Sequence, residues 1–243
     1  MSELIDKRAF KGLNNNQLKI IAMISMFIDH VGLTFFPQMK IFRYLGRLAF
    51  PIYAYMIAEG CKYTKNRKKY LGLIAILAII FQIVFFVFMK SIYQSILVNF
   101  SLSISAIFSI DSFIKNKNTK NRILMVLIIL AIFLVSIVFP IIFEDYGFAI
   151  DYDLWGLCLP ILVYFAPNKL WKITFTTILI ILMAVVSGSN MMWWSLLTIP
   201  LLILYNGERG SRNLKYLFYL FYPLHLVLIY IIAFLLAILK YYL

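Results

Sequence analysis

Most of the chain consists of long apolar runs separated by short charged or turn-forming segments. Nine runs can be distinguished, at 17–36, 41–60, 71–89, 93–110, 123–143, 148–166, 171–187, 193–205 and 214–239. A membrane-spanning helix needs about 20 predominantly apolar residues, so the eighth run is short for a span. The pattern predicts an all-α fold, a polytopic transmembrane helical bundle of about nine spans.

The composition agrees with a membrane protein. Of the 243 residues, 63% are hydrophobic and 14% are charged, whereas soluble domains have about 45–50% apolar and about 25% charged residues. No linker or shift in composition divides the sequence. We therefore expect a single integral membrane domain over 1–243, with any active site inside the bilayer or at its rim.

The distribution of charge predicts the orientation. A net charge of +13 is also found in nucleic-acid-binding proteins, but here the bases cluster between apolar runs, as in cytoplasmic loops of membrane proteins. We expect a cytoplasmic N-terminus, an outer C-terminus, the lipid bilayer as a partner and no nucleic acid. The clusters are Lys62, Lys65, Arg67, Lys68 and Lys69; Lys115, Lys117, Lys120 and Arg122; and Arg209, Arg212 and Lys215.

Ionisable residues inside the apolar runs are concentrated in the first two. Asp29 and His30 lie in the first run, and Arg43, Arg47 and Glu59 lie in the second. A charged side chain at the middle of a span costs about 2.5–3.5 kcal/mol on insertion scales. These residues are therefore candidates for a functional site.

Helical geometry brings some of these residues to one face. Lys19 and His30 are 11 positions apart, which places them within about 20° of one face and about 16 Å apart along the axis. If the first two spans form an antiparallel hairpin, Lys19 is level with Glu59, and Asp29 comes within reach of Arg47. Arg43 and Arg47, at positions i and i+4, could hold an anion such as a phosphate or carboxylate.

The same residues allow three interpretations. They could form a structural ion-pair network, relay protons through a transporter, or provide a histidine base oriented by a carboxylate. His225, which follows Pro223 in the last run, either packs against a neighbouring carbonyl or shares a cavity with His30. Asp151 and Asp153 form either an outer acidic lip or a solvated helix start.

Other patterns contribute little. Cys61 and Cys158 have no metal-ligand spacing, so we expect two free thiols and no metal. No P-loop, serine-hydrolase, zinc-protease or Rossmann motif occurs.

An ordered set of segments resembles the TraX family of bacterial membrane proteins. The segments are LKIIAMISMFIDHVG, GRLAFPIYAYMIAEG, IDYDLWGLCLP, LYNGERG and KYLFYLFYPLHLVLIY. The resemblance implies a multi-pass protein of the bacterial plasma membrane and the family's activity, N-terminal acetylation of conjugative pilin from acetyl-CoA. The segments FQIVFFVF and ILVNFSLSIS depart from the family's pattern, so the acceptor need not be a pilin.

The resemblance also implies roles for individual residues. In a wider superfamily of membrane acyltransferases, the first span carries a basic residue, ten intervening positions and a histidine, and Lys19 and His30 fit this spacing. His30 then corresponds to the catalytic histidine, and Asp29 and His225 are assigned to catalysis with it. The residues assigned to substrate binding are Lys19, Arg43, Arg47, Glu59, Asn206, Arg209 and Tyr222.

Two functions from different classes follow. The first is an acyltransferase that moves an acetyl group from cytoplasmic acetyl-CoA to a peptide amine or to a hydroxyl of an envelope glycan or polymer. The second is a non-enzymatic protein, either a proton-coupled transporter or an accessory or immunity factor, in which the same residues serve as an ion-pair network.

Overall fold

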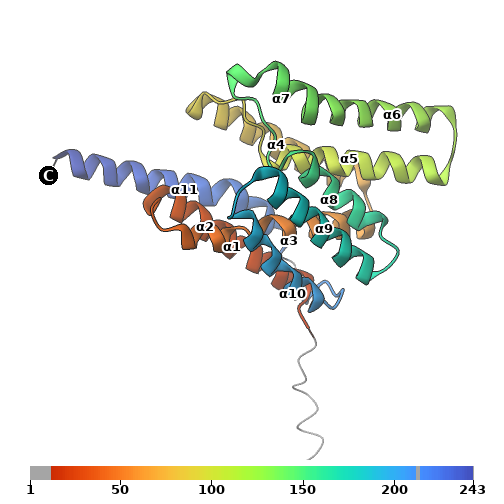
Figure 1. Ribbon diagram of the computed structural model, residues 1–243, viewed down its shortest axis with the longest axis horizontal. Coiled ribbons are helices and arrows are strands. Elements are labelled where there is room, and N and C mark those ends of the chain that lie inside the picture. Colours follow the sequence, from red (N-terminus) through yellow and green to blue (C-terminus); the bar gives the residue numbers. More distant parts are fainter. Residues whose placement is uncertain (1–11, 212–213, 243) are drawn as a thin grey trace, which may run out of the picture. The chain divides into compact units, whose positions relative to one another are not determined.

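The computed structural model describes residues 12–211 and 214–242, and these fall into two compact units. Unit 1 comprises the chain up to Ile52 and the residues from Trp194 onward, and unit 2 comprises Tyr53–Trp193. Within the described ranges the structure is helical, with two isolated backbone bridges and no β-strand (Figure 1). The all-α fold is thus confirmed, while the single domain over 1–243 stays a prediction.

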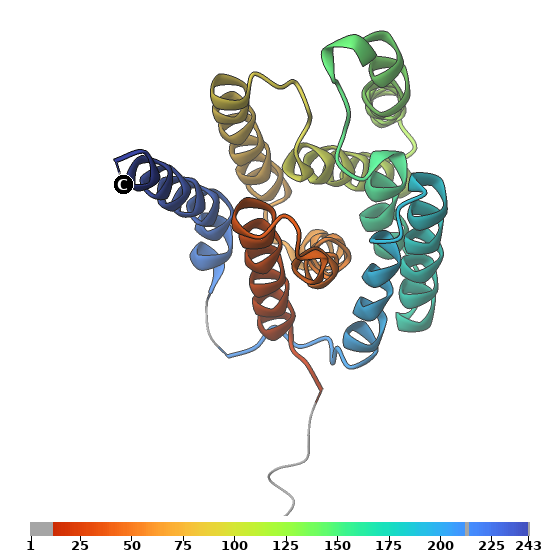
Figure 2. The same ribbon diagram turned by 60° about the vertical axis from the view of Figure 1, so that its left-hand side comes forward.

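Unit 1 is built around α1 (Asn15–Phe35), against which α2 (Lys40–Gly46) and α11 (Lys215–Tyr242) pack. Figure 2 shows α11 running beside α1. The hairpin between α1 and α2 is close because Gly32 has no side chain. A Cβ at that position would lie 2.1 Å from the Cβ of Phe42. The unit also contains the start of α3 (Ala49–Tyr63), most of a 3₁₀ turn (Met192–Leu197) and α10 (Thr198–Ile203).

The first residues of α1 are held by the segment that follows α10. Asn14 caps α1 by accepting a hydrogen bond from the Gln17 amide, and the Gln17 side chain accepts from the Asn14 amide in return. Leu13 pairs with the Leu204–Asn206 segment through two backbone hydrogen bonds of 2.8 and 2.9 Å. Consequently residues about 190 positions apart in sequence meet at one end of α1.

Unit 2 contains the rest of α3, α4 (Arg67–Met89), α5 (Ile96–Lys115), α6 (Thr119–Phe133), α8 (Asp153–Phe165) and α9 (Lys169–Ser187). A π-helical turn (Leu134–Val138), the short α7 (Phe139–Ile142) and a 3₁₀ turn (Glu144–Tyr146) follow α6. Helix α5 packs against α4, α6 and α8, and α8 packs against α9 (Figure 1). A cluster of buried side chains joins α5, α6 and α8: Ala106, Ile132, Ile150 and Leu157.

Each predicted apolar run contains helix, but only some of the helices are long enough to cross a bilayer. Six helices of the described chain satisfy the length and hydropathy of a span: Asn15–Phe35, Arg67–Val87, Ile96–Lys115, Thr119–Ile142, Lys169–Ser187 and Leu217–Leu239. The sixth and eighth predicted runs form the shorter apolar helices Asp153–Phe165 and Met192–Ile203. A multi-pass membrane protein is supported, and the count of nine spans stays a prediction.

The second predicted run, 41–60, is broken into two helices. Helix α2 ends at Gly46 and α3 begins at Ala49. Pro51 has no amide hydrogen to bond the carbonyl of Arg47, so one helix cannot continue through this position with its full set of hydrogen bonds. The proline instead falls in the first turn of α3, where it is tolerated.

The surface of several helices is apolar, as expected for helices that contact lipid. Large apolar side chains are exposed along α4, α6 and α11, including Ile76, Ile83, Leu127, Leu228 and Leu235. In water such faces would be unfavourable, whereas lipid tails cover them without cost. The orientation stays a prediction. Arg212 of the third basic cluster and the N-terminal bases Lys7, Arg8 and Lys11 lie outside the described residues.

Candidate functional site

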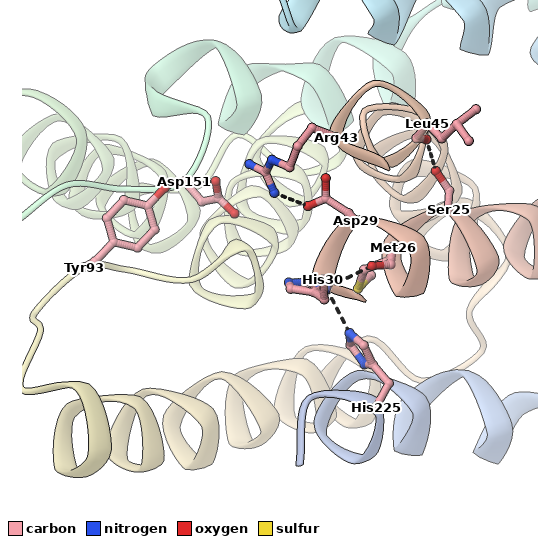
Figure 3. A network of polar contacts seen from close by, with 9 residues as sticks. All are labelled: Ser25, Met26, Asp29, His30, Arg43, Leu45, Tyr93, Asp151 and His225. Carbon is pink, nitrogen blue, oxygen red and sulfur yellow. Dashed lines mark hydrogen bonds and ion pairs between the residues drawn. The ribbon is translucent and has the colours of Figure 1, made fainter. Parts of the chain in front are cut away.

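The two histidines of the chain meet in unit 1. Nδ1 of His30 on α1 lies 3.2 Å from Nε2 of His225 on α11, although the residues are 195 positions apart. Their ring centroids are 5.0 Å apart with an interplanar angle of 59° (Figure 3). The sequence leaves two alternatives open for His225, and the structure shows both contacts: the ring faces a backbone carbonyl, that of Phe221, and it also lies against His30.

Each imidazole also contacts a backbone carbonyl oxygen of its own helix. His30 Nδ1 lies 2.9 Å from the Met26 carbonyl oxygen, and His225 Nδ1 lies 2.7 Å from the Phe221 carbonyl oxygen, each one turn earlier in its helix. The Phe221 ring stacks on His225 at 4.5 Å with an interplanar angle of 4°. These contacts hold both rings in defined planes.

The two histidines differ in burial. His225 is 4% exposed, whereas His30 is only half-buried. The second ring nitrogen of His30, Nε2, has no hydrogen-bond partner among the described residues, and it points away from His225 in Figure 3. Tyr222 approaches the edge of His225, with ring centroids 6.0 Å apart. His30 is therefore the more accessible member of the pair, and His225 is the buried one.

Asp29 pairs with Arg43, whereas we expected Arg47. Arg43 Nη1 donates to Asp29 Oδ2 at 2.6 Å (Figure 3). The carboxylate lies against Gly46, where an added Cβ would be 2.1 Å from Asp29 Oδ1. Arg47 affects Asp29 through its charge. The hydrogen bonds of the His30 ring go to Met26 and His225, so Asp29 is not the group that orients this imidazole.

A second group of predicted residues lies where α1 begins. The Asn206 side chain accepts from the Glu208 amide at 2.9 Å, and the Glu208 carbonyl accepts from the Asn15 amide at 2.8 Å. This arrangement brings the exposed Arg209 close enough to Lys19 for the two positive charges to interact. The Lys19 ammonium also lies 5.3 Å from the Phe218 ring centroid. Lys19 and Arg209 thus form one cationic region.

Glu59 belongs to unit 2, and it has a partner that the sequence argument did not consider. It accepts a hydrogen bond from Lys172 of α9, and the side chains of both residues are at most 10% exposed. We had placed Glu59 level with Lys19. The signal for this pair is Lys172 itself, a basic residue inside the seventh apolar run, 171–187.

Sequence reasoning also missed an ion cluster at the end of α5. Asp111 accepts from Arg67 of α4 and from Lys115, the latter at 2.9 Å. Asp111 lies one position beyond the predicted run 93–110 and was not singled out. An acid isolated between two basic loops was the signal that could have identified it.

The acidic segment before α8 is not merely solvated. Tyr93 donates to Asp151 Oδ1 at 3.0 Å, and Asn99 donates to the Asp151 carbonyl at 2.6 Å. Burial raises the pKa of the Tyr93 phenol, which lies in the connection between α4 and α5, and the charge of Asp151 raises it further. Asp151 therefore ties two segments of unit 2 together, and Asp153 is an exposed residue at the start of α8.

Within the described ranges, no three His, Cys, Asp or Glu side chains lie close enough together to hold a metal ion. Cys61 and Cys158 are both free thiols, as expected, and Cys61 is buried.

Comparisons with known proteins place these residues in a family. Over 86 residues the chain is 36% identical to the probable fimbrial assembly protein FimC, serogroup H1, of Dichelobacter nodosus, covering 34% of this chain and 33% of that protein. Over 38 residues it is 45% identical to the uncharacterized protein RP591 of Rickettsia prowazekii (strain Madrid E), covering 16% of this chain and 15% of that protein. The chain therefore matches about a third or less of the length of these relatives.

No solved structure matches the chain. The family profile described as TraX protein matches residues 14–233, which include every residue assigned to the site. The chain belongs to the TraX family.

Proposed function

We propose that this protein is a membrane-embedded acyltransferase that moves an acetyl group from acetyl-CoA to a nucleophile at the cell envelope. The observation that carries the proposal is the contact between His30 and His225, which holds one imidazole nitrogen of His30 away from its neighbours. The two histidines come from distant parts of the chain, and each is held by a backbone carbonyl and by the other histidine. This arrangement resembles a catalytic base and the residue that orients it.

The reaction needs a base because the attacking amine or hydroxyl must lose a proton. In the direct route, the acceptor atom bonds to the acetyl carbonyl carbon while its proton passes to His30. The carbon–sulfur bond of the thioester then breaks, and His30 returns the proton to the departing coenzyme A thiolate. In a covalent route His30 would carry the acetyl group between the two steps, with the same net exchange.

The cationic region supports binding of the donor. Lys19 and Arg209 are suited to phosphate groups of coenzyme A, because charge-assisted hydrogen bonds to phosphate are strong. Lys19 and His30 lie on the same helix, about 16 Å apart along its axis. A long, thin pantetheine arm can cover that distance, with the phosphates at the start of α1 and the thioester at His30.

Three other predicted residues, Arg43, Arg47 and Tyr222, support the acceptor side. Arg43 and Arg47 carry positive charge next to Asp29, and Tyr222 lies at the edge of the histidine pair. The relative FimC is named as a probable fimbrial assembly protein. We therefore propose the N-terminal amine of a surface-fibre subunit as the first acceptor to test, and an envelope hydroxyl as the second.

The decisive experiment measures consumption of acetyl-CoA by the purified protein in detergent, with and without a peptide that has a free N-terminal amine. We expect acetylated peptide and free coenzyme A in equal amounts, and loss of both with His30→Ala. Mass spectrometry of envelope extracts from cells with and without the protein identifies the natural acceptor by an acetyl-sized mass difference. Absence of transfer to any envelope component would favour the proton-coupled or accessory role.

We further propose that the protein lies in the bacterial plasma membrane with its basic loops in the cytoplasm. Cysteines introduced at Asn66 and Asn118, next to basic clusters, should be shielded from impermeant thiol reagents in intact cells. A cysteine at the exposed Tyr146, beside the acidic segment, should be labelled. Labelling at Asn66 from outside would reverse the orientation and the side from which the donor enters.

A further inference from the structure

The hydrogen bonds around the two histidines determine which nitrogens carry hydrogen. A carbonyl oxygen only accepts, so the ring nitrogen that faces it must donate. His225 Nδ1 faces the Phe221 carbonyl at 2.7 Å, and His30 Nδ1 faces the Met26 carbonyl at 2.9 Å. In both neutral rings the hydrogen is therefore on Nδ1, and each Nε2 has a lone pair.

This assignment makes the contact between the rings directional. His30 Nδ1 is a donor, and it also lies 3.2 Å from His225 Nε2. His225 Nε2 must then accept, because two N–H groups facing each other at this distance would repel. The His30 hydrogen is thus shared between the Met26 carbonyl and the His225 lone pair, and the arrangement requires a neutral His225.

We propose that His225 is a positioning residue for His30, and that Nε2 of His30 is the atom that receives the proton or the acetyl group. The inference rests on the acyltransferase proposal for its chemical role. When His30 gains a proton on Nε2, its Nδ1–H group becomes a stronger donor toward two acceptors already in place. His225 thereby fixes the tautomer and orientation of His30 by accepting from its Nδ1–H, which is one of the two roles of the carboxylate in a serine-protease triad.

Burial and packing agree with this division of roles. His225 is 4% exposed and lies between the Phe221 ring and His30, so it is placed to support rather than to meet a substrate. Asp29 is engaged by Arg43, which leaves His225 and Met26 as the groups that orient the His30 ring. His225 therefore acts through His30.

The chain has only two histidines, which allows a direct test. In protein labelled with [¹⁵N]histidine, nitrogen NMR at neutral to alkaline pH should show hydrogen on Nδ1 and a lone pair on Nε2 for both residues. His225→Phe keeps an aromatic ring against Phe221 and removes the acceptor, so the His30 resonances should move. Ile229→Val, one turn further along α11 at a site that is 2% exposed, should leave them in place.

A chemical probe tests the accessible nitrogen without acetyl-CoA. Diethyl pyrocarbonate bonds its carbonyl carbon to an imidazole lone pair and expels ethyl carbonate, which decomposes to carbon dioxide and ethanol. Mass spectrometry should find the modification first on His30. Hydrogen on Nε2 of His225, or modification of His225 as fast as His30, would overturn the proposal.

Kinetics then test the positioning role. His225→Phe should lower kcat about 10- to 100-fold, the value of one charge-assisted hydrogen bond, with the KM for acetyl-CoA unchanged. His225→Gln supplies an amide oxygen near the position of Nε2 and should restore part of the loss. Equal activity of the two variants would contradict the inference. If the wild-type protein transfers no acetyl group, the proposed function fails, and the NMR and diethyl pyrocarbonate results still decide how the histidines are arranged.

Discussion

The two units use their ionisable side chains in different ways. In unit 2, Glu59 pairs with Lys172, and Asp111 accepts from both Arg67 and Lys115. Each of these carboxylates is therefore matched by a cation. In unit 1, Asp29 pairs with Arg43 in the same way, but the histidines are held by backbone carbonyls and by each other, and His30 retains a nitrogen without a partner among the described residues.

On this difference we base the proposal of a structural role for Glu59 and a chemical role for His30. A carboxylate bonded to a buried ammonium lowers the cost of burying both charges, and it is not available to a substrate. An imidazole with one nitrogen anchored and the other open is oriented and still reactive. Glu59 and His30 are both ionisable residues within apolar runs, so their positions in the sequence do not distinguish them. Their hydrogen-bond partners in the structure do.

The largest expected effect is on the rate of acetyl transfer, and it follows from removing the His30 imidazole. His30→Ala should lower acetyl transfer by about 10²–10⁴-fold, the usual contribution of a positioned base, while the protein stays folded and binds the donor. Turnover is measured at saturating acetyl-CoA, with size-exclusion chromatography and donor binding as controls. Near-normal transfer by a folded His30→Ala protein would refute the mechanism and favour the ion-network interpretation of α1.

The next effect concerns stability in unit 2. Lys172→Met leaves the Glu59 carboxylate buried without its ammonium partner, which should lower the free energy of unfolding by about 3–5 kcal/mol. Thermal unfolding in detergent should show the loss. The double variant Glu59→Gln with Lys172→Met removes the charge as well and should recover much of it. If the single variant is as stable as the wild type, the pair is not the structural element that we infer.

A smaller effect should follow at the close approach in unit 1. Gly46→Ala would place a Cβ 2.1 Å from Asp29 Oδ1, and relief of the overlap should cost about 1–3 kcal/mol. Gly72→Ala on α4 is the matched control, since no atom lies within 4 Å of its added Cβ. That control should be neutral or slightly stabilising, because alanine favours helix over glycine. Equal thermal stability of the two variants would show that Asp29 can move away without loss.

The smallest expected effect is on donor affinity. Lys19→Ala and Arg209→Gln should each weaken binding of coenzyme A by about threefold to tenfold, and the effect should fade at high salt because dissolved ions screen the attraction between these charges and the phosphates. Equilibrium binding of coenzyme A provides the measurement. Lys40→Gln, an exposed base at the start of α2, is the control and should change little. If all three variants bind alike, the phosphates are not held at the start of α1.

The sequence alone predicted what depends on local periodicity. Long apolar runs predicted the helices, and the spacing of Lys19 and His30 placed them on one helix, as α1 confirms. Pro51 is also a local signal, because it indicates that the second run is broken into two helices. The length of that run instead suggested a single span. Such features follow from backbone geometry within a few turns, so they could be deduced without knowing which helices pack together.

Only the tertiary structure decided which side chains meet. Lys172 and Glu59 are 113 positions apart, and His225 and His30 are 195 positions apart. The sequence identifies the polar residues of an apolar helix, but it does not identify the helix that they contact. Packing between helices depends on the shapes of side chains along the whole interface. The hairpin argument therefore chose Arg47 for Asp29, whereas in the structure Asp29 lies against Gly46 and pairs with Arg43.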